Sequence, residues 1–354
     1  MDRPDLTDVD PIIRAYIEHL ESQVKAQSST EKNHNHSNIL PDAFVDQIEE
    51  QLPSELPTTF NIITISKSGM TKRTARHLYS RQHRGGMGIF DLDVASPDSP
   101  VILTCAGEAQ TMIVFSNTAR AFRLNVSKIS PTPVRSKGEI LFQRISLEPD
   151  ETIVAALGER ASGYVALASA SGRVRCLRHH LFGEHMKPGT AMYQYKDFGP
   201  LVSVCWTPGE SDLFLATRNG LAIRFNEKLV PPQGDLGIRL AGDDAVVAIT
   251  SVYPDSGVFL LGADGKGTVR FMTGFAPNKS MGGSGKLAMK CQKLVGATTI
   301  EQNDDLFIIT CQGKIIRFKA DEVPSTEGVI QGVNCISMRA DEVAAVIKTG
   351  LNHS

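Results

Sequence analysis

Lysine and arginine side chains gather in three stretches of the sequence, where they could bind phosphate groups. The first stretch contains Lys67, Lys72, Arg73, Arg76, Arg81 and Arg84, with His77 and His83 among them. Residues 61–90 contain no Asp or Glu that would offset this charge. A solvated face is the simpler alternative, but Lys and Arg that neutralise phosphates supply most of the sequence-independent affinity for nucleic acid. We therefore predict that this stretch contacts DNA.

Two further basic stretches follow, and the same two interpretations apply to them. The second contains Arg173, Arg175, Arg178 and Lys187. The third contains Lys266, Arg270, Lys279, Lys286 and Lys290, around the Gly-rich segment 281–285. Separate clusters suit a curved duplex, because its phosphates approach a protein surface repeatedly. Such contacts position DNA without reading its sequence.

Patterns that would support catalysis or a cofactor fail on their spacing. The Gly285-Lys286 pair resembles the end of a phosphate-binding loop, but Ser280 stands where that motif needs Gly and Leu287 where it needs Ser or Thr. The three histidines of segment 179–185 lack the HExxH spacing of a zinc site. We therefore predict no enzyme activity, no cofactor and no metal site.

Composition and charge indicate an intracellular protein with two unlike parts. The six cysteines are scattered without a CxxC pair, which favours reduced thiols over disulfides or zinc. The sequence has neither a secretory signal nor the ~20 apolar residues of a membrane helix. We expect a cytoplasmic, nucleoid-associated location. Residues 1–60 carry a net charge of −8 and residues 61–354 one of +6.

The acidic N-terminal part is predicted to be a short helical arm, residues 1–59. Asp10 and Pro11 favour a helix start, and apolar residues then recur at helical spacing over residues 11–25. This amphipathic helix predicts a partner or self-association. A polar linker over residues 28–37 and a second short helix over residues 41–52 follow. The arm could instead fold back on the basic body and compete with DNA, although a solvated tether is the simpler interpretation.

From residue 60 onward one pattern recurs six times: a β-rich run, a turn and a second run carrying an arginine. The first runs span residues 62–65, 112–115, 164–167, 213–216, 258–261 and 306–309. The arginines are Arg73, Arg123, Arg175, Arg224, Arg270 and Arg317, separated by 46 to 52 residues. Each unit predicts a β-hairpin, which cannot bury a core alone.

Six hairpins at an even period near 50 residues are typical of a β-propeller, in which each blade has about four strands. A sandwich would not predict so even a period. The fold class is therefore all-β: a six-bladed β-propeller of the β-pinwheel type with a helical N-terminal arm. We predict the propeller over residues 60–345 and a C-terminal tail over residues 346–354.

One segment narrows the choice among propeller families. Residues 82–88 lie within the first predicted blade and read Gln82, His83, Arg84, Gly85, Gly86, Met87 and Gly88. This segment resembles the gyrase A box, usually QRRGGKG, and segments 173–182, 217–225 and 310–318 are similar to blade patterns of the same family. The resemblance to the C-terminal β-propeller of DNA gyrase A covers about four-fifths of the chain.

The resemblance implies a non-catalytic module of a gyrase or topoisomerase IV type system, carried without the breakage-reunion core. Its partners would be duplex DNA, which bends or wraps around a basic outer rim, and the topoisomerase core subunits. The box would also help to close the ring. His83 and Met87 replace two usual cations, so plain bending is an alternative to tight chiral wrapping. The alternative is a protein-interaction scaffold recruited through residues 11–25.

Overall fold

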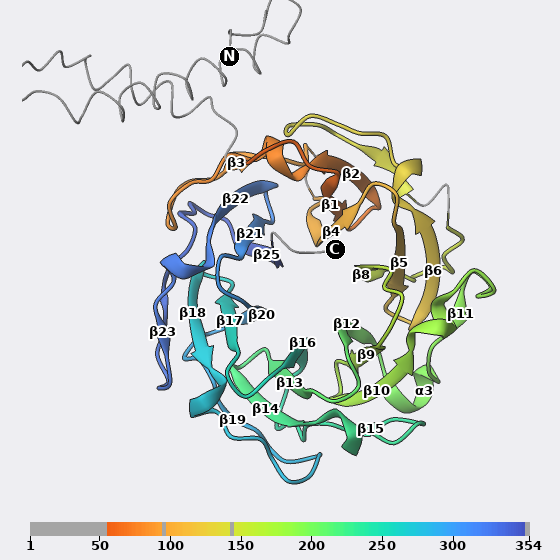
Figure 1. Cartoon of the computed structure of the whole chain (residues 1–354), viewed down its shortest axis with the longest axis vertical. Helices are drawn as coiled ribbons and strands as arrows, with labels where there is room; N and C mark the ends of the chain where they lie inside the picture. Colours follow the sequence, from red (N-terminus) through yellow and green to blue (C-terminus); the bar gives the residue numbers. More distant parts are fainter. Residues whose placement is uncertain (1–54, 94–96, 142–144, 351–354) are drawn as a thin grey trace, which may run out of the picture. The chain divides into compact units, whose positions relative to one another are not determined.

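The computed structural model describes residues 55–93, 97–141 and 145–350. The chain divides between Ser54 and Glu55, and the predicted helices of the arm, including residues 11–25, lie outside the described residues. Glu55–Ser354 forms a compact unit of its own. Its described part is a ring of six mainly antiparallel sheets around a central channel (Figure 1). The predicted all-β six-bladed propeller is confirmed.

Each blade has two long central strands, an inner strand beside the channel and a two-residue outer strand. From the channel outward, blade 1 contains β4 (Pro100–Gly107), β1 (Phe60–Ser66), β2 (Met70–Ala75) and β7 (Glu139–Ile140). Blade 2 contains β8 (Ile153–Gly158), β5 (Thr111–Ser116), β6 (Arg120–Asn125) and β11 (Thr190–Ala191). Blade 3 contains β12 (Leu201–Thr207), β9 (Tyr164–Ser169), β10 (Arg173–Arg178) and β15 (Asp235–Leu236).

The other half of the ring repeats this order. Blade 4 contains β16 (Val246–Val252), β13 (Asp212–Thr217), β14 (Leu221–Asn226) and β19 (Lys286–Leu287). Blade 5 contains β20 (Leu294–Ile300), β17 (Gly257–Gly262), β18 (Lys266–Phe271) and two short outer strands, β23 (Ser325–Thr326) and β24 (Val333–Asn334). Blade 6 contains β25 (Val343–Thr349), β21 (Asp305–Thr310), β22 (Lys314–Lys319) and β3 (Ile89–Phe90).

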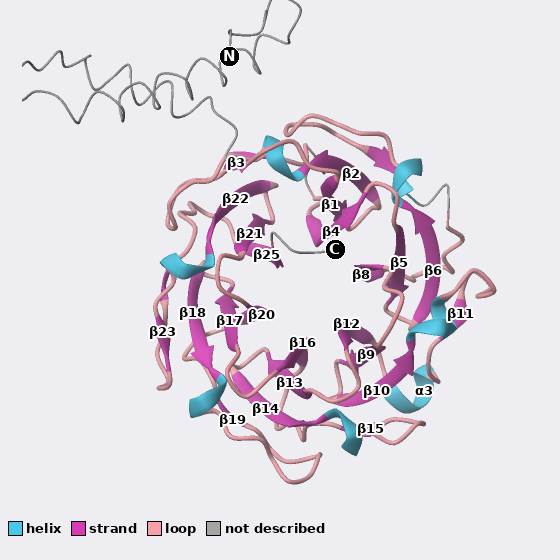
Figure 2. Ribbon diagram, in the orientation of Figure 1, coloured by secondary structure: helices cyan, strands magenta, loops and turns pink. Residues whose placement is uncertain are grey.

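Helical structure in the described chain is confined to single turns at the ring's periphery (Figure 2). A 3-10 turn follows the second central strand of every blade: η1 (Arg76–Leu78), η2 (Val126–Lys128), η4 (His179–Phe182), η5 (Glu227–Leu229), η6 (Met272–Gly274) and η7 (Ala320–Glu322). One α-helical turn, α3 (Tyr195–Phe198), precedes β12. The last inner strand reaches Thr349 and so includes residues that we expected in the C-terminal tail.

The hydrophobic pattern of the central strands explains why blades form and stack. All residues of β17 and β21 are buried, because a central strand is covered by both neighbouring blades. Apolar clusters therefore run between adjacent blades. For example, Val114 of β5 packs in one cluster with Ile63 of β1. The hydrophobic core therefore consists of the contacts between adjacent blades, called joints below, which continue around the ring. No blade has a separate core.

A rim loop precedes the outer strand of each blade and ends in a glycine with positive φ. The rim loops are residues 82–88, 132–138, 183–189, 228–234, 279–285 and 326–332. Residues 82–88, the segment that resembles the box, are thus one of six equivalent loops. Gly138 shows why glycine is needed, because its φ is +72° and an added Cβ would lie 2.2 Å from the Thr71 carbonyl oxygen.

Replacing Gly138 by alanine should therefore destabilise the propeller more than backbone strain alone does. Gly242 is the matched control, because its φ is +62° and an added Cβ would meet nothing within 4 Å. We expect Gly242→Ala to cost about 1 kcal/mol, the usual penalty of the left-handed conformation, and Gly138→Ala to cost distinctly more. Urea unfolding measures both. Equal costs would show that the rim loop can move away from Thr71.

Candidate nucleic-acid interface and ring closure

The segment that resembles the box closes the ring. It follows blade 1 in the sequence, yet β3 pairs with β22 of blade 6, with Ile89 opposite Ile315. The Gln82 amide donates to the Arg317 carbonyl of blade 6 at 2.8 Å. The Gly85 amide donates to the Cys335 carbonyl, which follows the outer strand of blade 5, at 2.8 Å. Residues 82–90 thus join blade 1 to blades 5 and 6.

The two residues that depart from the usual box face solvent. The His83 side chain is fully exposed and its Nδ1 lies 3.4 Å from Glu322 Oε2, and Met87 is 69% exposed. Arg84 is exposed but held, since its Nε donates to the Glu322 carbonyl at 2.7 Å. The glycines keep the turn tight, because a Cβ on Gly88 would lie 2.7 Å from the Ile315 carbonyl oxygen.

A buried ionic cluster lies at the joint between blades 6 and 1. The Lys72 ammonium group forms an ion pair with Asp91 and donates to the Val134 carbonyl. Tyr79 OH donates to Asp91 Oδ1 at 2.7 Å, and Thr64 Oγ1 donates to Asp91 Oδ2 at 2.9 Å. Burial lowers the pKa of Lys72, and the Asp91 carboxylate offsets part of that effect.

The other five joints lack this carboxylate. The backbone amide of Asp91 donates to the carbonyl of Gly313 in the hairpin turn of blade 6. In the other five blades, the residues whose backbone amides donate to the hairpin turn in the same way are Leu141, Met192, Gly237, Ala288 and Cys335. On the other side of the joint, Lys72 pairs with Thr64 across the hairpin of blade 1. The pairs at the same position in the hairpins of blades 2 to 6 are Val114 with Phe122, Leu167 with Arg175, Leu215 with Ile223, Leu260 with Thr268, and Ile308 with Ile316. The ionic cluster therefore marks the joint where the two ends of the ring meet.

Four of the repeat arginines are structural. Arg73, Arg123, Arg224 and Arg317 each stand four residues after the turn residue with positive φ. Arg224 pairs with Asp212 at 2.8 Å and donates to the Met272 carbonyl of η6 in the next blade. Arg317 similarly donates to the Tyr79 carbonyl beyond η1, at 3.0 Å, and so ties blade 6 to blade 1.

Arg175 and Arg270 do not belong to this series, which corrects the predicted repeat. Cys176 and Val269 occupy the equivalent positions, so Arg175 stands one residue early and Arg270 one residue late. Because successive side chains of a strand point to opposite faces, a shift by one residue changes the environment completely. Arg175 takes the position of Lys72 and donates to the Met192 carbonyl at 2.6 Å.

Arg270 lies where the hairpins of other blades have buried apolar residues. Its counterparts include Leu124, Phe225 and Phe318. It is 6% exposed, and its Nε and NH1 have no hydrogen-bond partner among the described residues. Burial lowers the pKa of the Arg270 guanidinium, and the Glu327 carboxylate offsets part of that effect. Arg270 is therefore a buried cation that its surroundings compensate only in part.

The structure separates the predicted DNA-contact residues into buried and exposed groups. Lys72, Arg73, Arg76 and Arg270 are buried. Arg81, Arg173, Arg175 and Lys266 are partly buried, and Arg81 forms an ion pair with Asp305 at 2.9 Å. Lys67, Arg84, Arg178, Lys187, Lys279 and Lys286 are exposed. Only the exposed group has its charge in solvent, because the side chains of the buried cations are enclosed by neighbouring strands and blades.

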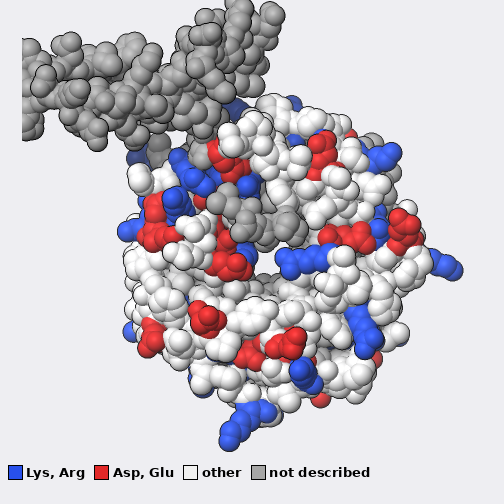
Figure 3. Space-filling model, in the orientation of Figure 1, with Lys and Arg blue, Asp and Glu red and all other residues white. Residues whose placement is uncertain are grey.

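The sequence analysis missed two exposed cations of the blade 1 rim loop, Arg135 and Lys137. The sequence pattern that could have identified them is the segment 126–138, which contains no Asp or Glu and ends in a glycine. The rim loops of blades 6, 1, 2, 3 and 4 carry exposed Lys or Arg, that of blade 2 together with the exposed Glu184, whereas that of blade 5 carries Glu327 and no Lys or Arg. Figure 3 shows Lys and Arg side chains extending beyond the outline of the ring at its right and lower edges.

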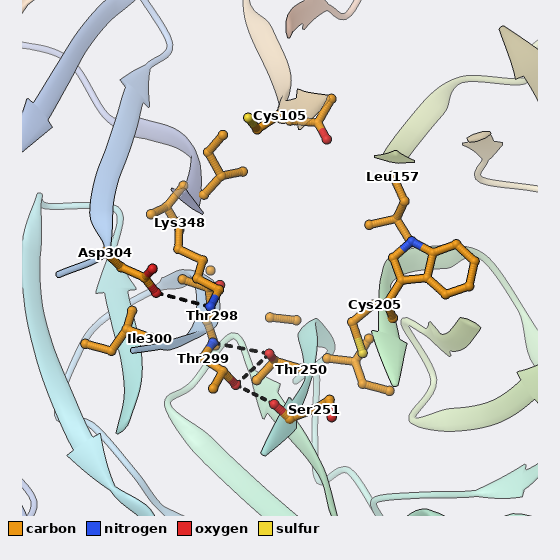
Figure 4. Close-up of a pocket in the computed structure, with 18 of the residues that line it drawn as sticks. Cys105, Leu157, Cys205, Thr250, Ser251, Thr298, Thr299, Ile300, Asp304 and Lys348 are labelled. Atoms are coloured by element: carbon orange, nitrogen blue, oxygen red, sulfur yellow. Dashed lines mark hydrogen bonds and ion pairs between the residues drawn. The ribbon is translucent and has the colours of Figure 1, made fainter. Parts of the chain in front are cut away.

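The central channel is a large hollow with a volume of about 1700 Å³. It is lined by the inner strands of all six blades. In Figure 4, Thr250 and Thr299 connect neighbouring blades through hydroxyl groups 2.9 Å apart, and Lys348 pairs with Asp304 at 3.1 Å. Burial raises the pKa of the Cys105 thiol to about 12 and also raises that of Cys205. Protonated thiols are poor nucleophiles.

Within the described ranges, no group of three or more His, Cys, Asp or Glu residues is arranged to hold a metal ion. His179 and His180 contact each other edge to face, with ring centroids 5.9 Å apart. None of the helices in the described residues has the length and apolar character needed to cross a membrane.

The ionic cluster predicts a specific pattern of stability in variants. Lys72→Met leaves the Asp91 carboxylate buried and unpaired, so we expect the free energy of unfolding to fall by about 3–5 kcal/mol. The triple change Thr64→Val, Lys72→Ile and Asp91→Leu installs residue types found at other joints and should recover most of that loss. Urea unfolding of both variants checks this. A Lys72→Met variant as stable as the original would contradict the buried ion pair.

Arg270 and Arg224 are both buried, and replacing each of them separately gives a matched comparison. We expect Arg270→Leu to leave the free energy of unfolding unchanged or to raise it, because a cation that is only partly compensated leaves an apolar site. Arg224→Leu removes the partner of Asp212 and should cost about 3 kcal/mol or more. Thermal and urea unfolding distinguish the two. A large loss in Arg270→Leu would mean that Glu327 compensates the cation in solution.

Comparison with known proteins shows what this chain is similar to. The family model for the DNA gyrase C-terminal domain, a β-propeller, matches residues 61–94, 110–157, 211–252 and 304–329. The DNA gyrase A protein of Mycoplasma pneumoniae is 26% identical over 291 residues, which are 79% of this chain and 35% of that protein. The DNA gyrase A protein of Salmonella typhimurium is 27% identical over 293 residues, which are 79% of this chain and 33% of that protein. The chain thus spans about a third of the length of these relatives.

Solved structures show the same fold. The DNA gyrase A C-terminal domain matches with a TM-score of 0.72 at 20% identity, covering 82% of this chain and 99% of that one. The C-terminal domain of DNA topoisomerase IV matches with a TM-score of 0.59 at 19% identity, covering 83% and 94%. The matched region is the propeller. The resemblance of the sequence is confirmed: the chain is similar to DNA gyrase A proteins over about four-fifths of its length, and its propeller has the fold of the DNA gyrase A C-terminal domain.

Proposed function

We propose that this propeller binds duplex DNA along its outer rim and bends it, as a non-catalytic module of a gyrase or topoisomerase IV type system. The observation that carries the proposal is the repetition of one loop around the rim. Equivalent rim loops of blades 6, 1, 2, 3 and 4 present exposed cations to solvent, namely Arg84, Arg135, Lys137, Lys187, Lys228 and Lys279. Cations repeated around a convex edge favour a curved path for the phosphates.

The remaining charge favours the rim over the two ends of the channel. Glu301 and Asp304 line one end of the channel, and Lys348 is already paired with both. Asp341 and Glu342 lie beside the hairpin turn of blade 6 at the opposite end of its strands. A duplex would meet carboxylates there. The acidic Glu327 also suggests that the duplex leaves the rim at blade 5.

A salt series of DNA mobility shifts tests the proposal. The variant Lys137→Gln/Lys279→Gln removes two exposed rim cations. We expect weaker binding and a salt dependence, log K against log salt, that is less steep by about two, because each lost phosphate contact removes roughly 0.9 from the slope. Such contacts act through charge, so the loss should be similar for unrelated DNA sequences.

The matched control is Arg160→Gln/Lys293→Gln, which removes two cations that lie off the rim. Arg160 lines the channel, and Lys293 pairs with Glu342. Its salt slope should stay near that of the original protein. Equal effects of the two pairs would overturn rim binding. Absence of DNA binding at low salt would favour the scaffold alternative, in which residues 11–25, outside the described residues, recruit a protein partner.

A further inference from the structure

An apolar patch interrupts the basic rim where the ring closes. It consists of Met87, Ile89 and Phe90, which are 69%, 38% and 50% exposed. The other outer strands of the described chain contain Thr190–Ala191, Asp235–Leu236, Lys286–Leu287, Ser325–Thr326, Val333–Asn334 and Glu139–Ile140, none with an aromatic residue. Phe90 is thus the one aromatic side chain presented by an outer strand within the described residues.

Cations surround this patch. The Arg135 guanidinium lies 5.4 Å and the Lys314 ammonium 5.3 Å from the centroid of the Phe90 ring. The next carboxylate in the sequence, Asp91, is fully buried and neutralised by Lys72. An apolar protein partner would have to desolvate these cations, whereas a polyanion would pair with them.

The patch is also rigid. Ile89 and Phe90 pair with Ile315 and Lys314 of β22, and Gly88 packs tightly against the Ile315 carbonyl. The Ser136 amide donates to the Asp91 carbonyl at 3.0 Å, which fixes the chain on the other side of Phe90. An apolar group held in place in this way loses little conformational entropy on binding.

We infer that Met87 and Phe90 form an apolar wedge for duplex DNA, which enters the minor groove at a base step while Arg135 and Lys314 hold the flanking phosphates. Exposed apolar side chains of minor-groove proteins partly unstack one base step and kink the duplex. The wedge would supply affinity and bending at the loop where His83 and Met87 replace the usual cations. This inference rests on the proposed DNA-binding function.

The full chain carrying Met87→Ala/Phe90→Ala tests the wedge on a duplex of about 40 base pairs with central TA steps, which unstack readily. We expect affinity to fall on the order of tenfold with the salt slope unchanged, because an apolar contact releases no counterions. The bend measured by end-to-end energy transfer should decrease. The fluorescence of 2-aminopurine at the central step should rise with the original protein and not with the variant.

Two controls separate the outcomes. Met87→Leu/Phe90→Leu keeps apolar bulk and should retain the bend, and Lys137→Gln/Lys279→Gln should flatten the salt slope while leaving the fluorescence rise. Unaltered affinity and bend in the alanine variant, with DNA still bound, would overturn the wedge alone. No binding by the original protein would overturn the DNA-binding function itself. If the alanine variant instead loses self-association in sedimentation while its DNA binding is unchanged, the patch is a protein contact and the inference is wrong.

Discussion

Closure of the ring is the constraint on which the whole structure depends. Every blade receives its outer strand from a segment that has already passed through the next blade, as β7 of blade 1 follows β5 and β6 of blade 2. Applied around the ring, this rule requires the outer strand of blade 6 to come from the segment after blade 1, which is β3. Residues 82–90 therefore have a structural role in closing the ring, which does not depend on any ligand.

The closing joint differs chemically from the other five. A buried ion pair between Lys72 and Asp91 replaces the contacts of residues such as Phe122 and Leu141 at the next joint. Buried ion pairs add little net stability, because desolvation offsets the attraction, but in some proteins they select one pairing among alternatives. The pairing of Asp91 with the buried Lys72 would in this way favour the docking of β3 on blade 6.

The placement of charge also explains how the rim differs from the interior. Arg224 and Arg317 connect one blade to the next through carbonyl groups at the 3-10 turns, so their charge does not reach a ligand. The lysines of the rim loops, such as Lys187 and Lys279, extend into solvent. Lys and Arg side chains therefore either connect blades in the interior or supply charge at the surface. Their position in a strand or in a rim loop determines which of the two roles they have.

The sequence by itself determined the six hairpins, because strand alternation and turn residues such as Gly172 and Gly313 are local properties. Residues 82–88 also resembled the gyrase A box, and this resemblance implied that they help to close the ring. Only the tertiary structure decided which cations are exposed. Lys72 and Arg84 lie in one basic stretch, but the first is enclosed between two blades and the second faces solvent. Burial depends on segments distant in sequence, here Asp91 and the loop at Val134, and the register that shifts Arg270 into an apolar site emerges only once the strands are paired.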